Sequence, residues 1–153
     1  MQLENIIGVI QGIRETTDII YDLFLGEKRA IAAMVLYFSD LTDLYEKDNS
    51  RTLLFGNMPI HGQIKRRSLK LMAERREIFK NKTLEGLLAL HKANIEIVYD
   101  NVISVTIKKG VLSASLEFVV RDNLRKKLSF SIERRQIAEV ESLINKLLPS
   151  KVK

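Results

Sequence analysis

The chain of 153 residues has no cysteine, no tryptophan and only two prolines. The absence of cysteine excludes disulfide bonds and thiol chemistry. No apolar run approaches the roughly 18 residues of a membrane-spanning helix, and the first residues lack the basic region of a signal peptide. We therefore expect a cytoplasmic protein, which could also lie peripherally at a membrane.

Catalytic motifs are also absent. There is no Gly-x-Ser-x-Gly elbow, no phosphate-binding P-loop and no dinucleotide-binding Gly-x-Gly-x-x-Gly. The only histidines, His61 and His91, lie far apart in the sequence, and a transition-metal site would need more ligands of this kind. Asp18 and Asp22 fall on one face of an expected strand, where we expect exposure to solvent. The sequence thus predicts no enzyme, no cofactor, no metal and no small-molecule substrate.

One acidic stretch could in principle bind a divalent cation through oxygen ligands. It lacks the spacing and the central glycine of a calcium loop, so an exposed acidic loop is the simpler interpretation. Its residues are Asp40, Asp43, Glu46 and Asp48.

Hydrophobic content of 46% and charged content of 29% are ordinary for a globular protein. A chain of this length is most simply one domain, 1–153. The net charge of +6 is uneven, because residues 61–92 hold nine basic and three acidic side chains. Such a segment can steer anionic partners.

Alternation of apolar and polar residues predicts an antiparallel sheet with one face in water. We expect strands within 5–38 and 95–132, with the chain reversing at Gly26, which tolerates positive φ. An amphipathic helix over 133–148 should follow, with Ser131 as its N-cap and Pro149 at its end. The core positions expected in the two strands 102–109 and 112–121 are Ile103, Val105, Ile107, Leu112, Ala114, Leu116, Phe118 and Val120.

The pattern becomes helical between the third and fourth strands. Residues 39–59 show no clear period and are interpreted as a loop with one short helix at most. A helix is expected from Ile60 to about Phe79, and Thr83 then offers an N-cap for a second helix, Leu84 to His91. We treat 60–92 as an insertion of two helices.

The first of these helices has two different sides. One side is basic and could contact anionic surfaces; the alternative is an ordinary solvated face. The basic residues are Lys65, Arg66, Lys70, Arg76 and Lys80. The other side is apolar and could contact a partner or a second copy of the chain; the alternative is packing on the chain's own sheet. The apolar residues are Ile64, Leu71, Met72 and Ile78.

Two short stretches resemble prokaryotic members of the pleckstrin-homology-like (PH-like) family. Residues 22–31, DLFLGEKRAI, look like the "leu-thr-asp-lys-arg-ile" hairpin of those proteins, with Gly26-Glu27 in place of threonine and aspartate. Residues 98–105, VYDNVISV, followed by KKGVL at 108–112, look like the "pro-tyr-glu-asn-ile" strand and its hairpin, with Val98 where a proline is common. The resemblance covers 5–38 and 95–148.

This resemblance implies an α+β fold: a seven-stranded antiparallel barrel or sandwich with a C-terminal capping helix. It also implies binding of lipid headgroups, peptides or further copies of the chain, and rarely catalysis. Headgroup-binding members carry several basic residues on the first hairpin loop, whereas loop 12–17 here has only Arg14, next to Glu15. No binding residue is therefore transferred from the family.

Together these patterns favour a non-enzymatic binding module. We expect it to contact a protein partner or itself through the insertion, with the basic helical face attracted to anionic surfaces such as a membrane. The alternative is a nucleic-acid-binding protein that uses the basic helix, 60–80, although no aromatic side chain interleaves with its basic residues.

Overall fold

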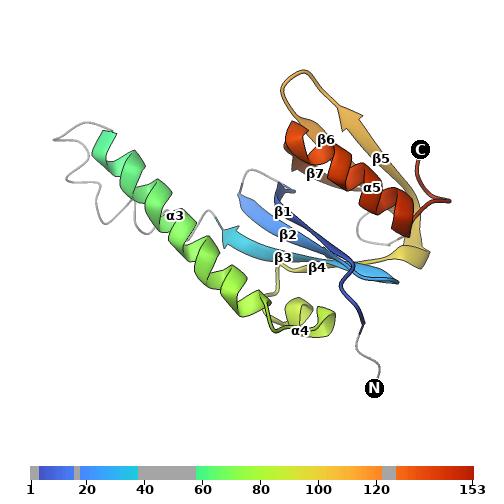
Figure 1. Cartoon of the computed structure of the whole chain (residues 1–153), viewed down its shortest axis with the longest axis horizontal. Coiled ribbons are helices and arrows are strands. Elements are labelled where there is room, and N and C mark those ends of the chain that lie inside the picture. Colours follow the sequence, from blue (N-terminus) through green and yellow to red (C-terminus); the bar gives the residue numbers. More distant parts are fainter. Residues whose placement is uncertain (1–3, 16–17, 38–57, 122–126) are drawn as a thin grey trace.

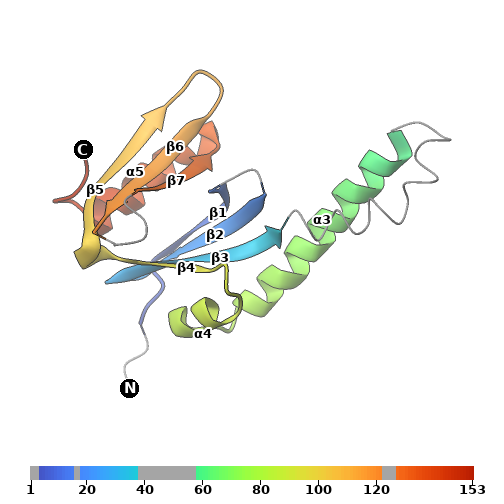
Figure 2. The same cartoon turned by 180° about the vertical axis from the view of Figure 1, so that it is seen from behind.

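The computed structural model describes residues 4–15, 18–37, 58–121 and 127–153. It shows an α+β protein with one antiparallel sheet of seven strands (Figures 1 and 2). The strands are β1 (Gly8–Arg14), β2 (Ile19–Leu25), β3 (Arg29–Tyr37), β4 (Ile95–Val98), β5 (Val102–Lys109), β6 (Ala114–Val120) and β7 (Lys127–Ile132). The helices are α3 (Met58–Phe79), α4 (Leu84–Ala89) and α5 (Ile137–Leu147), with single 3-10 turns η1 (Tyr99–Asn101) and η2 (Arg134–Gln136).

The strand order is β4-β3-β2-β1-β7-β6-β5, so β4 and β5 form the edges in the described part of the chain. The seven antiparallel strands are confirmed, and of the two expected arrangements, barrel or sandwich, the barrel is wrong because the sheet is not closed in the described part of the chain. β1 and β7 share only the pair Arg14–Ser131. The sheet thus consists of two sections, β1–β4 and β5–β7, joined at one narrow contact.

The main core lies between these two sections. It includes Tyr21, Leu23, Phe118 and Phe130, all at most 1% exposed. α5 packs against it through Val140 and Ile144, which are buried as its amphipathic pattern predicts. Burial of such side chains away from water is the main stabilising contribution in a domain of this size.

A second core lies on the opposite face of β2 and β3, beneath α3 and α4. Ile31, Ala33 and Val35 share this face, as their alternation predicts, and pack with Phe79 and Leu87. β3 is consequently buried on both faces, which explains why its sequence, RAIAAMVLY, is almost continuously apolar. The N-cap prediction for α4 is also confirmed, because the Thr83 hydroxyl accepts the Gly86 N–H at 3.0 Å.

Several local predictions are wrong for identifiable reasons. A register shift in β5 exposes Ile103 (48%) and buries Ser104 (5%), which reverses their expected positions. Leu112 is 92% exposed because it lies in the turn before β6 rather than in the strand. Ser131 belongs to β7, and the chain enters η2 through a reciprocal capping box between Glu133 and Gln136 instead.

The glycine prediction also needs correction. Among the described residues, positive φ occurs only at Gly12 (φ 70°), not at Gly26. Gly26 is required for close approach, because a Cβ there would lie 2.6 Å from a Leu84 methyl carbon. Gly12 allows the irregularity in β1 between Ile10 and Ile13, where the pairing with β2 shifts register.

Candidate functional site

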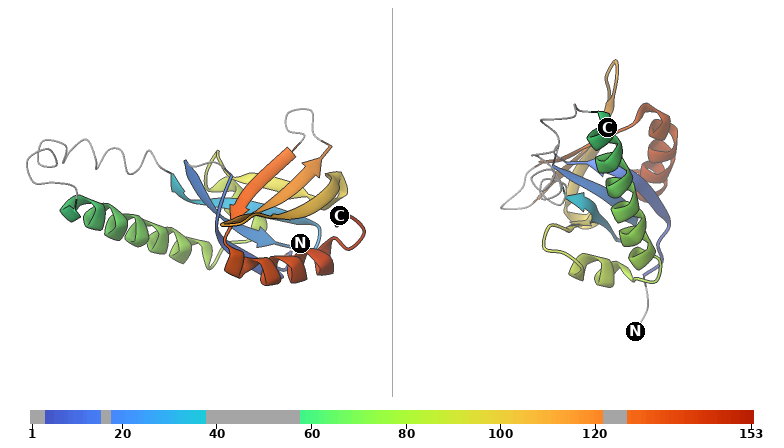
Figure 3. Two further views of the ribbon diagram at one scale, coloured as in Figure 1. Left: turned by 90° about the horizontal axis from the view of Figure 1, so that it is seen from above. Right: turned by 90° about the vertical axis from the view of Figure 1, so that its left-hand side faces the viewer.

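The candidate site is built around α3, which runs beside the sheet and continues past its end (Figures 1 and 3). The C-terminal part of this helix is docked on β2 and β3. Phe79 is 6% exposed and meets Phe24 edge-to-face at 5.7 Å between ring centroids. Arg75 donates to the Val35 carbonyl at 2.9 Å. These contacts fix the position of the helix.

The strongest polar contact of the docked part is an ion pair between Arg76 and Asp22. The guanidinium donates through Nε to Oδ2 at 2.7 Å and through Nη2 to Oδ1 at 2.9 Å. The Gly12 N–H also donates to Oδ1, at 3.0 Å. Asp22 is 1% exposed. A carboxylate buried this deeply is stable only if hydrogen bonds and an opposite charge replace its lost hydration, as they do here. The hydrogen bonds to Asp22 raise the pKa of Arg76.

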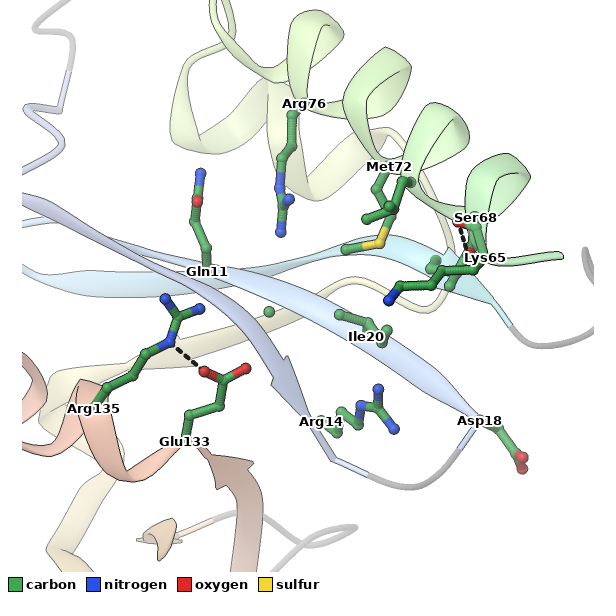
Figure 4. Close-up of a pocket in the computed structure, with 13 residues that line it drawn as sticks. Gln11, Arg14, Asp18, Ile20, Lys65, Ser68, Met72, Arg76, Glu133 and Arg135 are labelled. Atoms are coloured by element: carbon green, nitrogen blue, oxygen red, sulfur yellow. Dashed lines mark hydrogen bonds and ion pairs between the residues drawn. The ribbon is translucent and has the colours of Figure 1, made fainter. Parts of the chain in front are cut away.

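This pair corrects two expectations. Asp22 was expected in solvent with Asp18, whereas it is buried and only Asp18 is exposed. The sequence places Arg76 among the candidate contacts for anionic surfaces, whereas its side chain turns toward β2 and pairs with Asp22 (Figure 4). Sequence reasoning missed the pair because its partners come from separate parts of the chain. The available signal was one acid inside the otherwise apolar strand IIYDLFL.

A groove of about 510 Å³ lies between α3, the β1–β2 strands and the segment that enters α5 (Figure 4). Its floor and walls include apolar side chains, among them Ile20, Leu36 and Met72. Its charged lining residues are Arg14, Asp18, Lys65, Arg76, Glu133 and Arg135.

The charges around the groove are only partly balanced. Arg76 is bound to Asp22, and Arg135 forms an ion pair with Glu133. Arg14 and Lys65 have no ion-pair partner within the described ranges. The groove therefore presents two cations without an ion pair in the described ranges, with apolar surface and the Asp18 carboxylate in the same lining, and these cations can attract anionic groups.

The free part of α3 carries a dense run of cations. Lys65, Arg66, Arg67 and Lys70 are all exposed, and no ion pair joins them to any residue that the structure describes. Glu74 is the nearest acid of α3 that follows them in the sequence. Arg67 was missed in the sequence reasoning, although it lies directly beside Arg66.

The remaining predicted basic residue behaves differently. Lys80 follows the end of α3 and pairs with Glu77 at 2.8 Å, so it belongs to the docked end of the helix. Of the five predicted basic residues, three are exposed cations without an ion pair in the described ranges. One forms the pair with the buried Asp22, and one forms a pair at the surface.

The predicted apolar contact residues also separate. Met72 packs against the second core, and Leu71 is half-buried. Ile78 is 52% exposed, and Leu69 on the same helix is 57% exposed. The side chain of Ile64 lies outside the described residues, so its role stays a prediction.

The other candidate ligands give no assembled site among the described residues. Asp40, Asp43, Glu46, Asp48 and the His61 side chain lie outside the described residues. His91 accepts the Ala93 N–H through Nδ1 at 2.9 Å, which closes a local turn. No cluster of three metal-ligating side chains occurs in the described ranges.

Across the described ranges, no helix combines the length and the apolar character needed to cross a membrane. Comparison with protein-family models gives no match, and comparison with curated proteins finds no similar sequence.

Proposed function

We propose that this protein is a non-enzymatic binding module that attaches to anionic surfaces through the middle turns of α3, residues 65–70. The observation that carries the proposal is the run Lys65, Arg66, Arg67 and Lys70, exposed and free of ion pairs within the described ranges. A run of free cations on a projecting helix creates a positive potential that attracts phosphates and carboxylates.

The docked part of the helix supports this proposal. The Arg76–Asp22 pair and the buried Phe79 hold α3 in one position, so the cations are presented without first having to order the helix. Pre-organisation of this kind reduces the entropic cost of binding.

The size of the expected effect is modest. Each cation near an anionic membrane surface contributes about 1 kcal/mol, so four contribute about 4 kcal/mol. This corresponds to a Kd of about 1 mM. Stable attachment would need further contacts, which the groove beside Arg14 and Lys65 can supply.

We further propose that the fold is PH-like, with α3 and α4 inserted between β3 and β4 and α5 as the capping helix. The order β4-β3-β2-β1-β7-β6-β5 followed by a C-terminal helix supports this assignment. Fold alone says little about function, so the binding proposal depends on α3.

A protein or self contact on the same helix is the second candidate. Ile78 is more than half exposed on one side of α3, and Leu69, nine residues earlier and so on the opposite side, is more than half exposed as well. Exposed apolar side chains of this kind can contact a partner. Sedimentation velocity would test it: the proposal expects a concentration-dependent sedimentation coefficient that becomes constant in a Leu69→Ser/Ile78→Ser variant.

The main proposal is tested by co-sedimentation with phosphatidylcholine vesicles, with and without phosphatidylserine, and by retention on heparin, each across a salt series. We expect salt-sensitive binding to both anionic materials and none to neutral vesicles. In the Arg66→Glu/Lys70→Glu variant, loss of the two cations should weaken binding roughly 30-fold, and repulsion by the two new carboxylates should weaken it further.

The matched control is Lys82→Glu/Lys92→Glu, which changes the net charge equally at exposed positions around α4. Equal loss of binding in the two variants would show that total charge matters and α3 does not. Binding to duplex DNA with a steep salt slope, but not to vesicles, would favour the nucleic-acid alternative.

A further inference from the structure

The turn between β5 and β6 exposes two large aliphatic side chains. Val111 is 85% and Leu112 is 92% exposed, more than any other large apolar residue in the described ranges. The hairpin that carries them extends away from the rest of the sheet (Figures 1 and 2). Two adjacent aliphatic residues that are fully exposed at a projecting point indicate that they contact an apolar surface when the protein functions.

The tip is held in a fixed conformation. The Gly110 N–H donates to the Ser113 carbonyl at 2.8 Å, and the strands pair up to Lys109 and Ala114. A Cβ at Gly110 would lie 2.8 Å from the Ser113 oxygen, so the turn requires glycine. Arg134 also donates to the Val111 carbonyl at 2.8 Å. The aliphatic pair is therefore pre-organised rather than part of a loop that must fold on binding.

Cations surround the base of the tip. Lys108 pairs with Glu117 at 3.0 Å and Lys109 with Glu141 at 3.1 Å, yet both lysine side chains stay about 60% exposed. Arg134 has no carboxylate partner within the described ranges. An aliphatic tip with a cationic base matches a bilayer surface, in which acyl chains lie beneath anionic headgroups.

We propose that Val111 and Leu112 insert into the interface of an anionic lipid bilayer. This inference rests on the proposed function and specifies the anionic surface as a membrane. Electrostatic attraction alone gives weak attachment, and insertion of apolar side chains adds a contribution that salt does not screen.

The tip and the cationic helix can meet one membrane. η2 links the two places, because Arg134 contacts the tip and the adjacent Arg135 lines the groove beside α3. The hairpin and the N-terminal end of α3 also lie toward the same side of the molecule, the upper side in Figure 1 and in the right-hand view of Figure 3, and residues 65–70 follow that end along the helix.

The absence of tryptophan permits a direct test. A Leu112→Trp variant should show a blue-shifted emission with phosphatidylserine-containing vesicles, and lipids brominated on the acyl chains should quench it. The matched control is Leu90→Trp, at an exposed apolar residue after α4 (40% exposed), whose emission should not change. Vesicle binding by the Leu112→Trp variant with neither a shift nor quenching of its emission would overturn the inference.

A second comparison separates this inference from the proposed function. Val111→Ser/Leu112→Ser should lower vesicle binding roughly tenfold and leave heparin retention unchanged, whereas Arg66→Glu/Lys70→Glu should lower both. Heparin retention without vesicle binding in the wild-type protein would overturn the insertion and leave the cationic contact standing. A wild-type protein that binds neither heparin nor vesicles would overturn both the insertion and the cationic contact.

A protein contact at the tip is the remaining outcome. It would appear as a lower sedimentation coefficient of the serine variant in the absence of lipid, with vesicle binding unaffected. That result would also overturn insertion. Ile103→Ser, which removes an exposed aliphatic side chain elsewhere on β5 (48% exposed), is the control for a general change in surface hydrophobicity.

Discussion

The two parts of α3 use arginine in opposite ways. Toward its C-terminus, Arg75 and Arg76 turn onto the sheet and bind Val35 and Asp22. In the preceding turns, Arg66 and Arg67 are exposed, and no ion pair joins them to the rest of the described structure. The same residue type on one helix thus stabilises the fold at one end and is available for binding at the other.

The difference shows that a basic helix cannot be treated as one surface. Bound cations are compensated and contribute to stability, while free cations contribute to the field outside the molecule. Stability and binding should therefore be separable along α3, and substitutions in its two parts test this directly.

The largest expected effect is at the apolar anchor of the docked part. Phe79→Ala removes a buried ring that packs on Phe24, and such changes cost about 3–5 kcal/mol of unfolding free energy. Urea denaturation followed by circular dichroism would measure it. A loss below about 1 kcal/mol would mean that α3 is not anchored on the sheet as described.

The sharpest test makes the same substitution in both parts. Arg76→Met leaves the Asp22 carboxylate buried with only the Gly12 N–H, and we expect a loss of about 3 kcal/mol. Arg66→Met removes an exposed cation and should change stability by less than about 0.5 kcal/mol. Similar losses at the two positions would contradict the division of the helix.

A substitution at Gly12, the β1 residue whose N–H contacts Asp22, should have a smaller effect on stability. Gly12 adopts φ 70°, and a Cβ added there would meet only the Arg76 Nη2, at 4.0 Å. Gly12→Ala therefore introduces backbone strain without a clash, at about 1 kcal/mol. Urea denaturation would measure the loss, and a Gly12→Ala variant as stable as wild type would contradict the account of Gly12.

The smallest expected effect on stability concerns the ion-paired lysines of the sheet section β5–β7. Glu117 accepts hydrogen bonds from Lys108 and Lys127, which lowers its pKa. As pH falls, the unfolded state therefore takes up the proton on Glu117 before the folded state does. The contribution of this carboxylate to stability is present above the unfolded pKa and is lost as pH falls through the folded pKa. Glu117→Gln should be slightly less stable than wild type at neutral pH and equally stable in acid, as urea denaturation across a pH series would measure. A difference that persists at low pH would contradict this cause.

Local pattern predicted much of the fold. The alternation over Leu116 and Phe118 gives the buried face of β6, and helical periodicity gives most of α3. The pattern failed where a register shift or a turn interrupts it, as at Ser104 and Leu112. Such interruptions depend on the partner strand, which periodicity along one segment does not contain.

The candidate site was predicted only in part. The free cations follow from local charge, because exposed basic runs on helices are common. The Asp22–Arg76 pair does not, since it depends on how α3 packs on β2. The exposed tip was not predicted, for a related reason. The alternation that ends at Lys109 resumes in the sequence at Leu112, and only the position of the turn separates Leu112 from β6.

Hydrogen–deuterium exchange along α3, with and without phosphatidylserine-containing vesicles, tests the central claim most directly. We expect residues 71–79 to exchange equally slowly in both conditions, and residues 65–70, already helical in the free protein, to exchange more slowly still when vesicles are present. Vesicle binding that leaves exchange at residues 65–70 unchanged would contradict the assignment of this part of α3 as the binding surface.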